Sequence, residues 1–222
     1  NGPSNPSGVV INPGDNIQRV VNSKSAGTTF VLAAGVHKNQ TVAPRNNDKF
    51  IGRPGAVMDG GGSTEFAFGS GANNVLIEGI EIKNYKSPVG KGKGVIRSAG
   101  GAKNWTIRAN EIHHNLGSAI SIASGFKIVG NYLHYNQEYA LVGIGNDVLV
   151  EGNRIANNQK HGPKVGGDAG GSKFIRTVGL VLRGNCSHDN NGPGLWTDGG
   201  NIDTLYEGNM LVNNAHAGIK HE

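Results

Sequence analysis

The sequence predicts an all-β fold, a right-handed parallel β-helix with three short strands in each coil and a short helix near the N-terminus. Three observations predict this class. A strand-then-asparagine pattern repeats from residue 73 onward, apolar residues alternate within each repeat, and glycine supplies 37 of the 222 residues. The hydrophobic fraction of 36% lies below that of typical globular domains, so the chain requires a fold with many tight turns.

Two columns of asparagine define the repeat. In each column the successive spacings are 21, 22, 32 and 24 residues. Stacked asparagine amides can hydrogen-bond from coil to coil, and Asn and Gly tolerate the positive φ angles of tight corners. We therefore expect both columns to be structural. The first column contains Asn110, Asn131, Asn153, Asn185 and Asn209, and the second, five residues later, contains Asn115, Asn136, Asn158, Asn190 and Asn214.

Alternating apolar residues between these corners predict strands with one inward face. Val75 and Ile77, and in the next coil Trp105 and Ile107, occupy alternate positions that would point into the coil. A spacing of 21 to 24 residues suits three short strands per coil, and the preference of parallel crossovers predicts right-handed winding. The apolar period typical of helical repeats is absent.

The N-terminal segment predicts a cap for the solenoid. A short helix is expected over Asp15 to Val21, with Asp15 as its N-cap, covering the open edge of the first coil. We expect one domain over residues 1–222, with the cap and early coils in 1–72 and regular coils in 73–222. Because the chain ends inside an expected strand, we expect the natural protein to continue, and the open last coil to offer an edge for self-association.

Several segments resemble a known superfamily. The segments VINPGDNIQRVV, TFVLAAGVH and FIGRPGAVMDG, followed by repeated strand-Gly-Asn coils, resemble the pectate lyase-like superfamily. More narrowly, GGSKFIRTVGLVLRGN, HDNNGPGLWTDGG and AGIKHE are similar to secreted bacterial right-handed parallel β-helix repeat proteins. The resemblance implies the fold and a secreted or cell-surface location. It leaves the activity open, since the superfamily includes lyases, hydrolases, epimerases and noncatalytic adhesins.

The charge of the chain favours a polyanionic partner. The net charge is +5 and the sequence pI is near 9.4. An acidic polysaccharide fits better than nucleic acid, because the basic residues are not interleaved with stacking aromatics. No apolar run is long enough for a membrane span. Two glycine-rich basic insertions, residues 86–94 and 160–173, are natural binding elements on a rigid solenoid. They contribute the predicted substrate-binding residues Lys91, Lys93, Lys160, His161 and Lys173.

The sharpest candidate site follows the second asparagine column. Superposing GPKVGGD, GPGLWTD and AGIKHE places Asp168, Asp198 and Glu222 in one column. Strand alternation then turns Trp196 and Lys220 outward on the same face. Because adjacent coils lie about 4.8 Å apart, such a stack of like charges requires a cation, a shared proton or nearby lysines.

This column predicts one of two kinds of chemistry. The carboxylates could act as acid and base in the cleavage of a glycosidic bond, with Trp196 as a sugar-stacking surface. Alternatively, Asp168, Asp198 and Glu222 could bind Ca²⁺, which would bridge an acidic sugar and acidify the proton beside its carboxylate. A third interpretation treats the acids as ordinary surface residues.

Basic residues near the column complete the candidate catalytic set. In a lyase, Lys164 or Lys220 would abstract the acidified proton, and His221 is a further candidate because it adjoins the acids. Other histidines precede the second asparagine column, where outward positions with a packing role are expected, and no spacing among them forms a zinc signature. These are His113, His114, His134 and His188.

Two functions remain open from the sequence. The first is a secreted carbohydrate-active protein that binds and cleaves a polysaccharide, preferably acidic, by β-elimination or hydrolysis. The second is a noncatalytic glycan-binding or adhesive β-helix.

Overall fold

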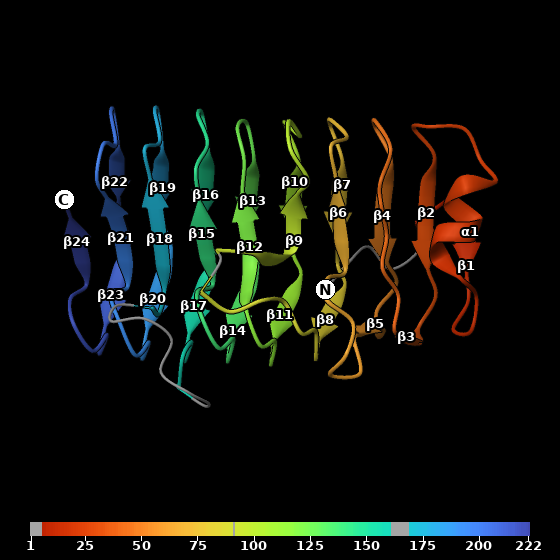
Figure 1. Ribbon diagram of the computed structural model, residues 1–222, viewed down its shortest axis with the longest axis horizontal. Helices are drawn as coiled ribbons and strands as arrows, with labels where there is room; N and C mark the ends of the chain where they lie inside the picture. Colours follow the sequence, from red (N-terminus) through yellow and green to blue (C-terminus); the bar gives the residue numbers. More distant parts are fainter. Residues whose placement is uncertain (1–5, 91, 161–168) are drawn as a thin grey trace.

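The computed structural model describes residues 6–90, 92–160 and 169–222. Three parallel sheets run along an elongated solenoid, with the short helix α1 at the N-terminal end and β24 at the other (Figure 1). We call the sheets A, B and C. In each regular coil the chain forms one strand of sheet A, then one of sheet B, then one of sheet C. Among the described residues, no helix has the length and apolarity needed to cross a membrane.

The strands of each sheet follow the chain from coil to coil. Sheet A consists of β1 (Val9–Ile11), β2 (Thr29–Leu32), β4 (Lys49–Gly52), β7 (Leu76–Glu78), β10 (Thr106–Arg108), β13 (Lys127–Val129), β16 (Leu149–Glu151), β19 (Val181–Arg183) and β22 (Leu205–Glu207). Sheet B consists of β3 (Gly35–Lys38), β5 (Ala56–Asp59), β8 (Glu81–Lys83), β11 (Glu111–His113), β14 (Tyr132–His134), β17 (Arg154–Ala156), β20 (Cys186–His188) and β23 (Met210–Val212). Sheet C consists of β6 (Phe68–Ser70), β9 (Gly94–Ser98), β12 (Ser118–Ile122), β15 (Leu141–Gly143), β18 (Ser172–Ile175), β21 (Leu195–Asp198) and β24 (Ile219–His221).

The core is a column of apolar side chains enclosed by the three sheets. The register pairs Ile107 with Ile77 on one side and with Ile128 on the other, and all three side chains are fully buried. Trp105 stacks on Phe126 of the next coil, with ring centroids 5.5 Å apart and an interplanar angle of 11°. The predicted inward alternation and three strands per coil are therefore confirmed.

Both predicted asparagine columns are hydrogen-bonded ladders. In the first ladder, Asn131 donates from Nδ2 to Oδ1 of Asn153 at 3.0 Å, and its backbone N–H donates to the same oxygen at 2.9 Å. Asn153 in turn donates from Nδ2 to the Ile128 carbonyl at 2.8 Å. The ladder side chains thus satisfy backbone groups that the corners leave unpaired, which is a requirement for buried turns.

The positive φ angles lie one residue earlier than the asparagines for which we expected them. Gly130 (φ 61°) precedes Asn131, and Tyr135 (φ 52°) precedes Asn136. The asparagine itself must keep its amide directed along the solenoid axis to reach the next coil. The preceding residue therefore makes the turn, and a glycine often occupies that position because it pays no Cβ penalty there.

Helix α1 (Ile17–Asn22) closes the N-terminal end of the core. Its N-cap is Asn16, whose Oδ1 accepts the Arg19 N–H at 2.8 Å. The predicted N-cap Asp15 is wrong by one residue, since its carboxylate instead closes the preceding turn. The helix covers the first coils with two fully buried apolar side chains, Ile17 and Val21.

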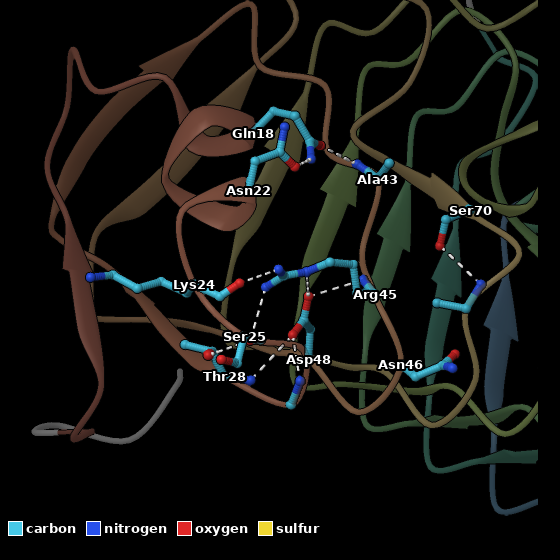
Figure 2. Close-up of polar contacts among 12 residues, drawn as sticks. Gln18, Asn22, Lys24, Ser25, Thr28, Ala43, Arg45, Asn46, Asp48 and Ser70 are labelled. Atoms are coloured by element: carbon cyan, nitrogen blue, oxygen red, sulfur yellow. Dashed lines mark hydrogen bonds and ion pairs between the residues drawn. The ribbon is translucent and has the colours of Figure 1, made fainter.

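A buried carboxylate ties the segment after α1 to the next coil. Asp48 is fully buried and accepts the backbone N–H groups of Gly27 at 2.9 Å and Thr28 at 3.2 Å. Arg45 donates to the same carboxylate from its backbone N and from Nε, and its guanidinium also reaches the carbonyls of Lys24 and Ser25 (Figure 2). These donors therefore compensate the negative charge of Asp48, and this group of hydrogen bonds holds the segment after α1 against the next coil.

Candidate functional site

The outer face of sheet C carries a row of one aromatic and two basic side chains from successive coils. The register pairs Trp196 on β21 with Lys220 on β24, and Lys173 lies at the adjoining position of β18. The Lys173 ammonium lies 3.8 Å from the centroid of the Trp196 ring, and the Lys220 ammonium lies 4.2 Å from it. We call Lys173, Trp196 and Lys220 the lysine–tryptophan row; each contact is a cation–π interaction.

Both described carboxylates of the predicted acid column accompany this row. Asp198 Oδ2 lies 2.8 Å from Lys173 Nζ. Glu222 accepts the indole N–H of Trp196 at 2.9 Å, and its other oxygen lies 3.5 Å from Lys220 Nζ. The predicted compensation of the acids by lysines is present in these three coils, so neither carboxylate stands alone on the face.

The ring of Trp196, predicted to stack on a sugar, is covered in this arrangement. Trp196 is outside the apolar core, as expected from the inward position of Leu195, but it is only 5% exposed. The ammonium groups of Lys173 and Lys220 come from the coils on either side and cover the ring. A sugar ring would have to displace a lysine before it could stack.

The predicted superposition of residues 162–168 on residues 192–198 is also wrong. Asp198 pairs with Ile175, so the strand equivalent to β21 in the preceding coil is β18, several residues after the predicted one. The close backbone approach at Gly171, where an added Cβ would lie 2.1 Å from the Gly194 carbonyl oxygen, shows why that glycine aligns with Gly194. The glycine-rich sequence before Asp168 resembles the glycine pattern that precedes β21. This similarity explains why the sequence alignment placed Asp168 opposite Asp198.

Four predicted site residues lie outside the described part of the chain: Lys91, His161, Lys164 and Asp168. The predicted Ca²⁺ site includes one of them, Asp168, and so remains a prediction for Asp198 and Glu222 together with that residue. The same holds for the proposed role of Lys164 as a base.

The structure separates three other predicted residues from the lysine–tryptophan row. His221 Nδ1 lies 2.7 Å from the hydroxyl of the buried Thr197, on the inner side of the strand and opposite to Lys220 and Glu222. Lys160 is exposed near Asp189, whose pKa is lowered mainly by His188 and also by the Lys160 charge. That position is the corner after sheet B. Lys93 is exposed on the segment that lies over sheet C.

A hollow adjoins the row where residues 86–90 and 92–93 lie on sheet C. Gly90 N–H donates to Oε1 of Glu138 at 3.0 Å, and Ser118 Oγ donates to Oε2 at 2.9 Å. The hollow has a volume of about 290 Å³ and is lined by Gly90, Gly92, Glu138, Tyr139, Val142, Lys173 and Ile175. Since Lys173 belongs to both, the hollow and the lysine–tryptophan row form one continuous surface.

Glu138 is the functional candidate that the sequence did not single out. It is only 3% exposed, and burial raises the pKa of its carboxyl, although the hydrogen bonds from Ser118 and Gly90 oppose the shift. A carboxyl with a raised pKa in a hollow is a candidate proton donor. The available signal was an acid two residues after Asn136, at the position where the coils of Asn115 and Asn190 carry glycine.

Histidines on the outer face of sheet B form a further group of polar side chains in contact with one another. His113 pairs with His134 on the outer face, and His188 occupies the same row two coils further along. Their outward position agrees with the prediction from the sequence.

The architecture and its outward face define a class, a parallel β-solenoid with a basic and aromatic surface along one sheet. Residues 7–222 match the family described as the right handed beta helix region, and the chain belongs to this family. The match confirms the fold class predicted from the sequence. A search of curated protein sequences found no significant match.

Several solved structures are similar to this chain at low sequence identity. The A-module of the mannuronan C-5 epimerase AlgE4 from Azotobacter vinelandii is 12% identical, with a TM-score of 0.55 over 92% of this chain and 68% of that module. Pectate lyase Pel9A is 11% identical, with a TM-score of 0.49 over 93% of this chain and 71% of the lyase. The surface adhesin PfbA of Streptococcus pneumoniae is 12% identical, with a TM-score of 0.40 over 96% and 93% of the two chains.

Proposed function

We propose that the protein is an extracellular carbohydrate-active β-helix that binds an acidic polysaccharide along the outer face of sheet C. The observation that carries the proposal is the lysine–tryptophan row continuing into the hollow lined by Lys173. From β15 to β24 this surface spans three coil spacings, about 14 Å, which accommodates several linked sugars. The shared fold with a mannuronan epimerase is consistent with this substrate class but does not assign it.

The charges of the row suit a chain of sugar carboxylates. Lys173 and Lys220 are each held beside one protein carboxylate, Asp198 and Glu222 respectively. These pairs are partly solvent-exposed, so each is worth roughly 1 kcal/mol or less. A sugar carboxylate can therefore replace the protein carboxylate at little cost, and the net charge of +5 favours its approach.

Cleavage is the second candidate function, and Glu138 favours it. In both β-elimination and hydrolysis, a protonated carboxyl can donate its proton to the glycosidic oxygen as the bond to that oxygen breaks. The raised pKa of Glu138 suits this role, and Lys173 in the same hollow would hold a sugar carboxylate. If Glu138 serves only to anchor the segment 86–94, the protein is the noncatalytic glycan-binding β-helix instead.

Binding is tested by titrating the 222-residue chain with acidic and neutral polysaccharides, with and without Ca²⁺, at low and high salt. We expect binding to the acidic polymers that weakens with salt, and loss of about tenfold in affinity in the double variant Lys173→Ala and Lys220→Ala. Lys127→Ala, on the exposed face of sheet A, is the matched control and should bind normally. Equal binding of neutral polymers, or an unaffected double variant, would contradict the proposal.

Cleavage is followed in the same samples by reducing ends and by the ultraviolet absorbance of an unsaturated sugar. A rise in both signals indicates a lyase, and reducing ends alone indicate a hydrolase. Either activity should fall in Glu138→Gln while binding persists. Binding without either signal, in a folded protein, assigns the noncatalytic function.

A further inference from the structure

A second polar cluster lies on the outer face of sheet B, away from the lysine–tryptophan row. Strand pairing sets His113 of β11 directly beside His134 of β14, and Glu111 begins the same strand as His113. One ligand atom from each of these three side chains lies within 4.8 Å of the others. Among the described residues, this is the group of three histidine, cysteine or acidic side chains that is compact enough to hold a metal ion.

We propose that Glu111, His113 and His134 bind a divalent transition-metal ion such as Zn²⁺. Imidazole nitrogen together with carboxylate oxygen is a donor set that zinc, copper and nickel accept, whereas Ca²⁺ prefers oxygen alone. The site is independent of the glycan-binding surface and of the predicted Ca²⁺ site, both of which concern sheet C.

The donor atoms already face one another. His134 Nε2 lies 3.0 Å from Glu111 Oε1, and His113 Nε2 lies 3.3 Å from Oε1 of Glu81 on the neighbouring strand β8. Two imidazole nitrogens thus each lie beside a carboxylate oxygen. The Glu81 oxygen is also paired with Lys83 Nζ at 2.6 Å, so the proposed ligands are Glu111, His113 and His134 alone. The stacked rings of His113 and His134 have centroids 4.8 Å apart. Ligands of one zinc ion lie about 3.3 Å apart, given bonds of about 2.0 Å, so the rings must tilt toward each other on binding.

His134 is the most buried of the three proposed ligands. Its side chain is 7% exposed, and its buried Nδ1 has no hydrogen-bond partner in the described structure. Either ring nitrogen of a histidine can serve as a ligand atom, and Nε2 of His134 is the one that faces Glu111.

A neighbouring histidine orients one of the ligands. His113 Nδ1 lies 2.6 Å from His114 Nδ1. If the proton lies on His113 Nδ1, the lone pair of that ring is on Nε2, next to Glu81. Such an outer hydrogen bond is the usual means of fixing the tautomer of a metal-binding histidine.

The site opens onto a hollow that can admit an exchangeable ligand. Glu81, Glu111 and Tyr132 line a hollow of about 230 Å³ at the corner between sheets A and B. Water or a small anion could occupy an open coordination position there.

The first test is calorimetric titration of the untagged 222-residue chain with ZnCl₂ in metal-free buffer. We expect one Zn²⁺ per chain and a rise in melting temperature with metal. Single variants His113→Ala, His134→Ala and Glu111→Gln should each lose at least tenfold in affinity, in line with losses on removal of a metal ligand or its support. Co²⁺ should give a visible absorption band in the wild type that the variants lack.

The matched control is His188→Ala, on the same outward row but paired with Arg154 and Asp189. It should bind Zn²⁺ normally. Melting curves without metal show which variants fold; Glu111→Gln changes a half-exposed side chain and is therefore the variant to use if His134→Ala does not fold. Absence of saturable binding, or equal binding by Glu111→Gln and the wild type, would overturn the proposal. We expect glycan binding, measured with a metal chelator present, to be the same whichever result is obtained.

Discussion

At the scale of single residues, the asparagine ladders show how a buried polar side chain can determine a fold. Asn153 accepts hydrogen bonds from the backbone N–H and the side chain of Asn131, and it donates to Ile128 and to Asn185. It is 1% exposed, so water cannot replace these bonds. Removing the amide leaves several buried groups unpaired.

We therefore expect Asn153→Ala to destabilise the protein by about 3 kcal/mol, because each buried unpaired group costs roughly 1 to 3 kcal/mol. Chemical denaturation of the variant and the wild type measures the difference. Asn146→Ala, at an exposed position, is the control and should change the stability by less than about 0.5 kcal/mol. A similar effect of the two substitutions would mean that the ladder is not a source of stability.

At the scale of elements, one segment is held on sheet C by a few polar contacts. The described residues of 86–94 are bound through Glu138, which accepts the Gly90 N–H, and through Ser121, which accepts the Gly94 N–H and donates to the Gly92 carbonyl. The position of this segment on sheet C therefore depends on hydrogen bonds to Glu138 and Ser121.

The raised pKa of Glu138 predicts a pH dependence of stability. A carboxyl whose pKa is higher in the folded than in the unfolded state stabilises the fold at pH values below its unfolded pKa, and this contribution is lost as the pH rises through the folded pKa. The melting temperature of Glu138→Gln minus that of the wild type should therefore increase from acidic toward neutral pH. Glu151→Gln, on an exposed side chain, should show no such trend. A constant difference for Glu138→Gln across the pH range would argue against a raised pKa.

At the scale of the whole molecule, the solenoid of the 222-residue chain presents an unpaired edge at β22, β23 and β24. Each of these strands is the last in its sheet and pairs on one side only. Apolar side chains are exposed there, including Met210 at 58% and Ile219 at 44%. Free strand edges with apolar side chains favour pairing with another chain.

We expect this chain to self-associate with increasing concentration, as sedimentation velocity would show. Ile219→Asp should shift the equilibrium toward monomer because it places a charge at the edge. Ile144→Asp, which changes an exposed apolar residue within the solenoid, should not. A strict monomer at high concentration would remove this prediction.

The sequence by itself determined the class of fold, the number of strands per coil and both asparagine ladders. These features repeat along the chain, and each is set by contacts between equivalent residues of adjacent coils, so their spacing is visible in one dimension. It also indicated that Lys220, Asp198 and Glu222 share the outward face of Trp196, because strand alternation assigns side chains to faces.

Only the tertiary structure decided which of these residues meet. The register of β18 against β21 placed Ile175 opposite Asp198, because the close backbone approach of Gly171 to Gly194 and the inward Phe174 outweighed the sequence similarity before Asp168. The docking of residues 86–94 on Glu138, and the stacking of His113 on His134, likewise depend on coil-to-coil distances. Insertions of unequal length make the number of residues per coil vary along the sequence. In the folded chain, adjacent coils nevertheless lie at a constant distance. The residues that meet at each site could therefore be identified only from the structure.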